Sequence, residues 1–233
     1  MIMPWDDILD DELRAVLAKR AERPLIGRRP ALIAVDLYDL VYDGGPRPVV
    51  ELMEEFPASC GEFAWNALPT TIELFAAVRA RDIPIIHVNY DSREETDPRN
   101  VHPTNRKRRQ SNLALYTIKE ELRPIPGELV IYKKRASAFF GTPLSAFLNE
   151  MQVDSLLVIG ESTSGCLRAT AIEGWSFGYS VTVIEDGCFD RSLLNHKVSL
   201  FDLHAKYATV AKLADVLGVL PSKNPRELVE TMQ

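Results

Sequence analysis

The sequence is poor in cysteine, with only Cys60, Cys166 and Cys188 among its 233 residues. An odd number of cysteines without a C-x-x-C pair argues against a disulfide framework or a zinc knuckle and favours a reducing compartment. The first residues lack the apolar segment of a secretion signal, and no apolar run approaches the length of a membrane span. We therefore expect a cytoplasmic protein that binds no membrane.

Basic charge and the common metal and phosphate motifs are lacking as well. The net charge of −6 leaves no positive excess for binding the phosphates of a nucleic acid. On such an acidic chain the basic run at 106–109 is interpreted as a solvated loop or a partner-facing arm. There is no H-E-x-x-H motif and no glycine-rich phosphate loop. We expect neither a metal ion, nor a cofactor, nor a nucleic acid partner.

Short apolar runs that alternate with helical patterns are abundant. Such alternation predicts the α/β class, here a three-layer Rossmann-like fold in which a six-stranded parallel sheet carries helices on both faces. We expect one domain over 1–233, in which 1–30 form an N-terminal helix and arm. The expected strands are 31–37, 83–88, 129–132, 156–159, 180–184 and 207–211.

The expected helices are 10–20, 69–81, 142–151, 192–206 and a segment that begins near Cys166. Thr142 is expected to cap its helix, with Pro143 at the first helical position. The segment 116–122 is also compatible with a helix, whereas 38–68 is expected to be a long loop because it is rich in glycine and proline.

Cys166 lies at a corner where a buried strand gives way to a helix. The strand ends at Gly160, five polar or small residues follow, and Cys166 falls in the first helical turn. A thiol there faces unpaired backbone N–H groups and the positive end of the helix dipole, which favour the thiolate. The position fits a nucleophile, and it also fits a small buried side chain.

Three further polar residues follow or end predicted strands. Asp36, Lys133 and Arg191 would join Cys166 along one rim, because the carboxyl ends of parallel strands meet at the same edge. A lysine can stabilise a thiolate and a carboxylate can carry a proton, so this set suits attack on a carbonyl carbon. Asp36 could instead cap a turn and Arg191 could be a surface residue. None of the four histidines is predicted at this rim, which disfavours a cysteine–histidine pair.

Three segments resemble the isochorismatase-like cysteine hydrolases, and most closely their N-carbamoylsarcosine amidohydrolase branch. Residues 32–37, LIAVDL, resemble the strand that ends in the catalytic aspartate. Residues 133–144, KKRASAFFGTPL, resemble the family's lysine segment, and 162–171, STSGCLRATA, its nucleophile segment. The resemblance extends over roughly 31–217.

The resemblance implies a catalytic triad of Asp36, Lys133 and Cys166, with Lys134 as the neighbour of the catalytic lysine. It also implies a cis peptide bond at Glu161–Ser162 and an oxyanion hole formed by the N–H groups of Ser162 and Cys166. An arginine that grips the substrate carboxylate would be Arg191. A metal is not implied, because the ligand set of the metal-binding branch is missing near Asp36.

The implied activity is hydrolysis of the C–N bond in a small linear amide or carbamoyl compound that carries a carboxylate. A thioester would form and ammonia would leave, and relatives suggest a homo-oligomer, either a dimer or a tetramer. Two alternatives stay open. One is an isochorismatase-type vinyl-ether hydrolase, which does without the cysteine, and the other is a non-catalytic binding member of the same fold.

Overall fold

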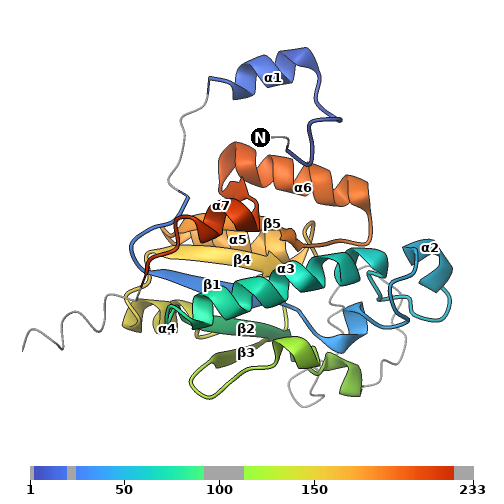
Figure 1. The fold of residues 1–233 in the computed structure, drawn as a ribbon, viewed down its shortest axis with the longest axis horizontal. Coiled ribbons are helices and arrows are strands. Elements are labelled where there is room, and N and C mark those ends of the chain that lie inside the picture. Colours follow the sequence, from blue (N-terminus) through green and yellow to red (C-terminus); the bar gives the residue numbers. More distant parts are fainter. Residues whose placement is uncertain (1–2, 20–24, 92–112, 223–233) are drawn as a thin grey trace, which may run out of the picture.

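The computed structural model describes residues 3–19, 25–91 and 113–222. Its six-stranded sheet has the order β3-β2-β1-β4-β5-β6, and every neighbouring pair runs parallel (Figure 1). The predicted parallel sheet is therefore confirmed. Its strands are β1 (Pro30–Val35), β2 (Ile85–Tyr90), β3 (Leu129–Lys133), β4 (Ser155–Gly160), β5 (Ser180–Cys188) and β6 (Thr209–Ala211).

Helices cover both faces of the sheet, as the sequence predicts. The alternating side chains of β1 divide between two cores, with Leu32 and Ala34 in one and Ile33 and Val35 in the other. The first core lies under α3 and α7, and the second lies under α4, α5 and α6 (Figure 1). The helices are α1 (Asp11–Leu17), α2 (Val49–Leu52), α3 (Glu62–Arg79), α4 (Leu144–Glu150), α5 (Cys166–Ser176), α6 (Leu193–Lys206) and α7 (Leu213–Leu217).

The predicted loop at 38–68 is wrong at two places, where helices form. The short helix α2 lies within it, and α3 begins at Glu62 and continues through Pro69. A proline inside a helix removes one backbone hydrogen bond. The buried face of α3, which includes Ala64, Leu68 and Leu74, packs on the sheet and outweighs that loss.

Smaller differences occur at the ends of elements. The strand β5 extends to Cys188, so that 185–187, predicted to follow the strand, lie within it beside a register irregularity. The helix α4 begins at Leu144 with Pro143 as its cap residue, one position later than predicted. The candidate helix at 116–122 is instead part of two short 3-10 turns, Leu113–Tyr116 and Glu120–Leu122.

The N-terminal arm is attached through Trp5. The indole is 2% exposed and lies against Phe201 and His204 of α6, with ring centroids 6.1 and 5.2 Å away. The helix α1 that follows has no buried residue and stands apart from the sheet (Figure 1). In 3–19, 25–91 and 113–222, none of the helices combines the length and apolar character that a membrane crossing requires.

Candidate active site

Asp36, Lys133 and Cys166 meet at the carboxyl edge of the sheet. Asp36 directly follows β1, Lys133 is the last residue of β3, and Cys166 is the first residue of α5 after β4. Lys133 reaches across β2, since β3 is not adjacent to β1, and its Nζ lies 2.7 Å from Oδ2 of Asp36. The two ionic side chains are 2% and 1% exposed. The sequence-predicted rim thus brings these groups together.

A close backbone contact holds the ends of β4 and β1 together at this edge of the sheet. Gly160, the last residue of β4, has φ 113°, and a Cβ there would stand 2.1 Å from the carbonyl oxygen of Val35. Only glycine permits such contact between the backbones of β4 and β1. Asp36, the residue after Val35, has φ 53°, a left-handed conformation that aspartate tolerates better than most residues.

The carboxylate of Asp36 is only half satisfied. Its Oδ2 accepts the hydrogen bond from Lys133, whereas its Oδ1 is buried and has no partner in the part of the chain that the structure describes. A buried carboxylate oxygen without a donor is unusual in a folded protein. Such an oxygen is available to accept a proton from a neighbouring group.

The adjacent lysines point to different places. Lys133 binds Asp36, whereas Nζ of Lys134 donates to the carbonyl oxygen of Asp91 and lies 5.4 Å from the ring centre of Tyr90. Burial lowers the pKa of Lys133, but its interactions with the Asp36 carboxylate and with Cys166 outweigh burial and raise the pKa above its usual value. Lys133 is therefore a fixed positive charge at this site.

The thiol of Cys166 interacts with both members of this pair. Burial and the carboxylates of Asp36 and Glu161 raise the pKa of Cys166, and the opposing effect of Lys133 is smaller than their sum. The helix start and the lysine favour a thiolate, but burial and the two carboxylates outweigh them, so the surroundings favour the thiol. Cys166 therefore needs a base before it can act as a nucleophile.

The turn before Cys166 leaves two backbone N–H groups without an acceptor. The peptide bond Glu161–Ser162 is cis, as the resemblance implies. Within the described residues, the N–H groups of Ser162 and Cys166 donate to no other group, although every other N–H from 161 to 167 does. The acceptors of those others are Val35 O, Phe189 O, Asp190 Oδ2 and, twice, Ser162 O.

Arg191 lies three residues beyond β5, which neighbours β4. Its Nε is buried and has no hydrogen-bond partner among the residues that the structure describes. No interaction joins Arg191 directly to Asp36, Lys133 or Cys166 within those residues. The structure therefore places Arg191 at the same rim but outside the cluster of three.

Sequence reasoning missed three buried polar residues at this rim. Asp190 accepts from the backbone N–H of Ser164 in the turn at 161–165, which we call the nucleophile turn. Glu161 is 6% exposed, and its Oε1 lies 3.9 Å from Sγ of Cys60. Tyr38 is buried, and burial together with the charges of Asp36 and Glu161 raises its pKa well above the usual value. Their positions directly before Arg191, at the start of the turn and two residues after Asp36 were the available signals.

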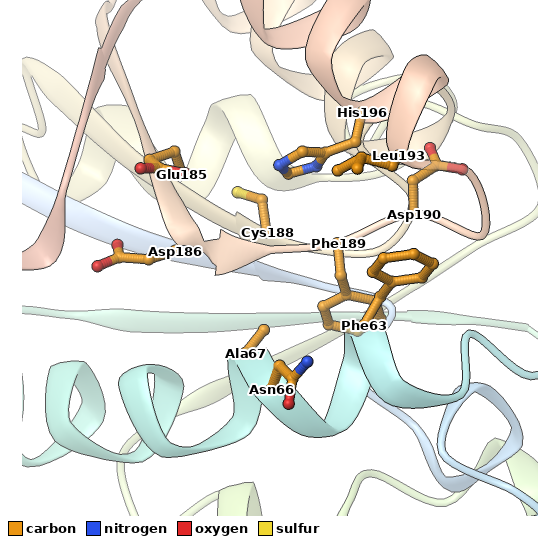
Figure 2. A pocket seen from close by; sticks show the side chains of 10 residues that line it. All are labelled: Phe63, Asn66, Ala67, Glu185, Asp186, Cys188, Phe189, Asp190, Leu193 and His196. Atoms are coloured by element: carbon orange, nitrogen blue, oxygen red, sulfur yellow. The ribbon is translucent and has the colours of Figure 1, made fainter. Parts of the chain in front are cut away.

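A cavity of about 250 Å³ lies behind the turn and not at the cluster of three. Oγ1 of Thr163 in the turn is 2.8 Å from Nδ1 of His196, whose pKa burial lowers to about 4. Figure 2 shows the residues that line the cavity from α3, β5, the segment after β5 and α6, which are Phe63, Asn66, Ala67, Glu185, Asp186, Cys188, Phe189, Asp190, Leu193 and His196.

Metal ligation finds no support in the described residues, where no cluster of three or more His, Cys, Asp or Glu side chains could hold an ion. The basic run at 106–109 and His102 lie outside the described residues. The donors at the rim are one amine, one guanidinium and backbone N–H groups, which suit an anionic or carbonyl ligand.

Comparison with known proteins gives matches over most of the chain. Residues 30–215 match the model of the isochorismatase domain. The chain is 38% identical over 101 residues to a maleamate amidohydrolase from Pseudomonas putida, which covers 43% of this chain and 47% of that protein. It is 28% identical over 203 residues to an N-carbamoylsarcosine amidase from Arthrobacter, covering 83% and 72%. The chain thus spans about half the length of the first relative.

A solved structure extends the likeness to the fold. An isochorismatase family protein from Desulfovibrio vulgaris superimposes with a TM-score of 0.68 at 27% identity. The match covers 83% of this chain and 99% of the other.

Proposed function

The chain belongs to the isochorismatase family, and from that premise we propose that it is a cysteine-dependent amidohydrolase. Its substrate would be a small linear amide or carbamoyl compound that carries a carboxylate, and its product would include ammonia. The observation that carries the proposal is the convergence of Asp36, Lys133 and Cys166 at one buried point.

Proton transfer begins the proposed reaction. Cys166 rests as a thiol because its pKa is raised, chiefly by burial. The unpartnered Oδ1 of Asp36 takes the thiol proton while Oδ2 stays bound to Lys133. The positive charge of Lys133 then stabilises the thiolate, which attacks the carbonyl carbon of the substrate.

The N–H groups of Ser162 and Cys166 receive the negative oxygen that this attack creates. Support comes from the neighbouring N–H groups of the turn, whose hydrogen bonds are used within the fold. Donors that are already oriented towards developing charge contribute about 10²–10³-fold each in rate. Asp36 returns its proton to the departing ammonia, and a thioester with Cys166 remains.

Water completes the cycle. Asp36, again a carboxylate, removes a proton from water as the oxygen attacks the thioester carbon, and the thiolate leaves. The acid product departs and Cys166 recovers its proton. For a carbamoyl substrate the acid product is a carbamate, which loses carbon dioxide.

Arg191 is the proposed partner of the substrate carboxylate. A guanidinium binds a carboxylate with paired hydrogen bonds, and the buried Nε of Arg191 has no acceptor among the described residues. Names of the relatives suggest two test compounds with an amide close to a carboxylate, maleamate and N-carbamoylsarcosine.

Replacement of the nucleophile tests the proposal. The variant Cys166→Ala should release no ammonia from any member of a panel of small amides, including maleamate and N-carbamoylsarcosine, that the unmodified protein hydrolyses. Its circular dichroism should match the parent, because the side chain is small. The variant Cys188→Ala, in a buried cysteine away from the cluster, is the control. Turnover that survives in Cys166→Ala would turn the assignment towards a reaction that needs no thiol.

A further inference from the structure

Asp190 contacts two parts of the rim that the proposed function assigns to different tasks. Its Oδ2 accepts from the backbone N–H of Ser164 at 2.8 Å and from the hydroxyl of Ser164 at 2.7 Å. Its Oδ1 accepts from the backbone N–H of Arg191 at 2.8 Å. The residue is 5% exposed, so water does not substitute for these contacts.

Ser164 lies at the centre of the nucleophile turn, with Ser162 two positions before it and Cys166 two positions after. The N–H groups of these two flanking residues have no acceptor within the described chain. The position of Ser164 therefore controls the direction of both N–H groups. A carboxylate that holds Ser164 through two charge-assisted hydrogen bonds restrains that direction strongly.

We infer that Asp190 is a positioning residue that fixes the distance and orientation of Arg191 relative to the proposed oxyanion hole. One oxygen orients the turn and the other orients the residue that binds the substrate carboxylate. The distance between the scissile carbonyl and the substrate carboxylate is thereby selected by a single side chain. The inference rests on the proposed function for the roles of Arg191 and the turn.

The chemistry of the contacts requires a carboxylate. Every group that faces Asp190 in these contacts is a donor, namely two backbone N–H groups and one hydroxyl. An asparagine offers one acceptor oxygen and two N–H donors. In the variant Asp190→Asn the NH2 group faces an N–H of either the turn or Arg191, and repulsion between these donors loosens both contacts.

Two probes of Cys166 report the two tasks separately and require no hydrolysis of an amide. The first is the ratio of alkylation rates by iodoacetate and iodoacetamide, which differ mainly in the carboxylate that Arg191 would bind. The second is protection of Cys166 by acetaldehyde. Its carbonyl carbon bonds to Sγ, and the thiol proton moves to the carbonyl oxygen, which enters the proposed oxyanion hole. Mass spectrometry of the Cys166 peptide measures both.

The expected pattern separates the four variants. Asp190→Asn lowers both the alkylation ratio and the acetaldehyde affinity by about tenfold, the scale of one charged hydrogen bond. Arg191→Gln lowers only the ratio, and Ser164→Ala lowers only the acetaldehyde affinity. Asp186→Asn changes neither, since Asp186 is a half-buried aspartate of β5 whose Oδ1 accepts from the N–H of Leu213 instead.

A purely structural role predicts a different result. In that case Asp190→Asn would behave as Asp186→Asn does, or would lower the melting temperature and leave both probes unchanged, and the inference would be wrong. If Asp190→Asn does not fold, Asp190→Glu decides, because it keeps the charge but moves it by one methylene and should disturb both probes. If the parent protein hydrolyses no amide but Asp190→Asn still lowers both the alkylation ratio and the acetaldehyde affinity, the inference is supported although the proposed function fails.

Discussion

The two ends of strand β3 carry carboxylates whose hydrogen bonding differs: Glu128 at the start is half-buried, and Asp36, which contacts the end of the strand, is fully buried. At the start, Glu128 precedes the strand and accepts from Arg79 at 2.8 and 3.0 Å, from the N–H of Ile125 at 3.1 Å and lies 2.9 Å from Nε2 of His87. At the end, Lys133 serves only one oxygen of Asp36. The other oxygen of Asp36 has no partner in the described part of the chain.

This difference separates a fully paired carboxylate, Glu128, from the carboxylate that we propose to be the base, Asp36. Burial raises the pKa of Glu128, but the hydrogen bonds from Arg79 and His87 outweigh it and lower the pKa overall. Glu128 is thus held as an anion with both oxygens occupied. Asp36 keeps one oxygen unoccupied beside the thiol of Cys166, and an unsatisfied buried oxygen costs stability.

The largest effect on turnover is expected from a change at Asp36. Asp36→Asn keeps the shape of the side chain and tolerates the positive φ of this position, but it removes the proposed base. Ammonia release should fall by about 10⁴-fold, the upper end for acid–base catalysis, because the proposed reaction assigns three successive proton transfers to Asp36. Circular dichroism checks that the variant is folded. A loss of less than about tenfold would mean that another group carries the proton.

The next prediction concerns the protonation of Cys166, which lies beside Asp36 at the same end of β3. Because burial and two carboxylates raise its pKa, the thiolate fraction should grow tenfold for each pH unit throughout the neutral range. Alkylation by iodoacetamide should therefore keep rising beyond about pH 8.5, where a free thiol such as glutathione levels off. A plateau near neutral pH would instead indicate the thiolate that the sequence position favours.

The smallest effect on turnover is expected at the other end of β3. Glu128→Gln removes the charge that pairs with Arg79 and one of the oxygens that His87 and Ile125 contact, so the free energy of unfolding in urea should fall by about 2 kcal/mol. Ammonia release should stay at the parent level. Glu120→Gln, in an exposed pair with Arg123, is the control and should leave stability nearly unchanged. Lost turnover in folded Glu128→Gln would erase the distinction between the two networks.

The sequence predicts the sheet well because its strands are nearly continuous apolar runs. All six residues of β1 and of β4 are buried, and that pattern leaves few alternatives. The start of α3 could not be predicted, since Pro69 and the glycine-rich stretch before it are local signals for a loop. Tertiary packing of the buried face, which includes Ala64 and Leu68, overrides them.

The candidate site divides in the same way. Asp36, Lys133 and Cys166 could be found because each ends or follows a predicted strand within a distinctive motif. The protonation of Cys166 could not, because it depends on the balance between burial, two carboxylates and one lysine. Asp190 was missed because its contacts join residues 26 positions apart, which only the folded chain brings together.

The main-chain contact at Gly160 makes the geometry of the proposed site independent of the side chains in the surrounding core. The backbones of β4 and β1 touch there, so the spacing between Asp36 and the turn that follows β4 depends on main-chain contact and not on side-chain size. Neutral drift can exchange core side chains on both faces without moving the proposed base away from the proposed nucleophile. A lineage built on this contact can change its preferred substrate widely while it keeps one way of breaking a bond.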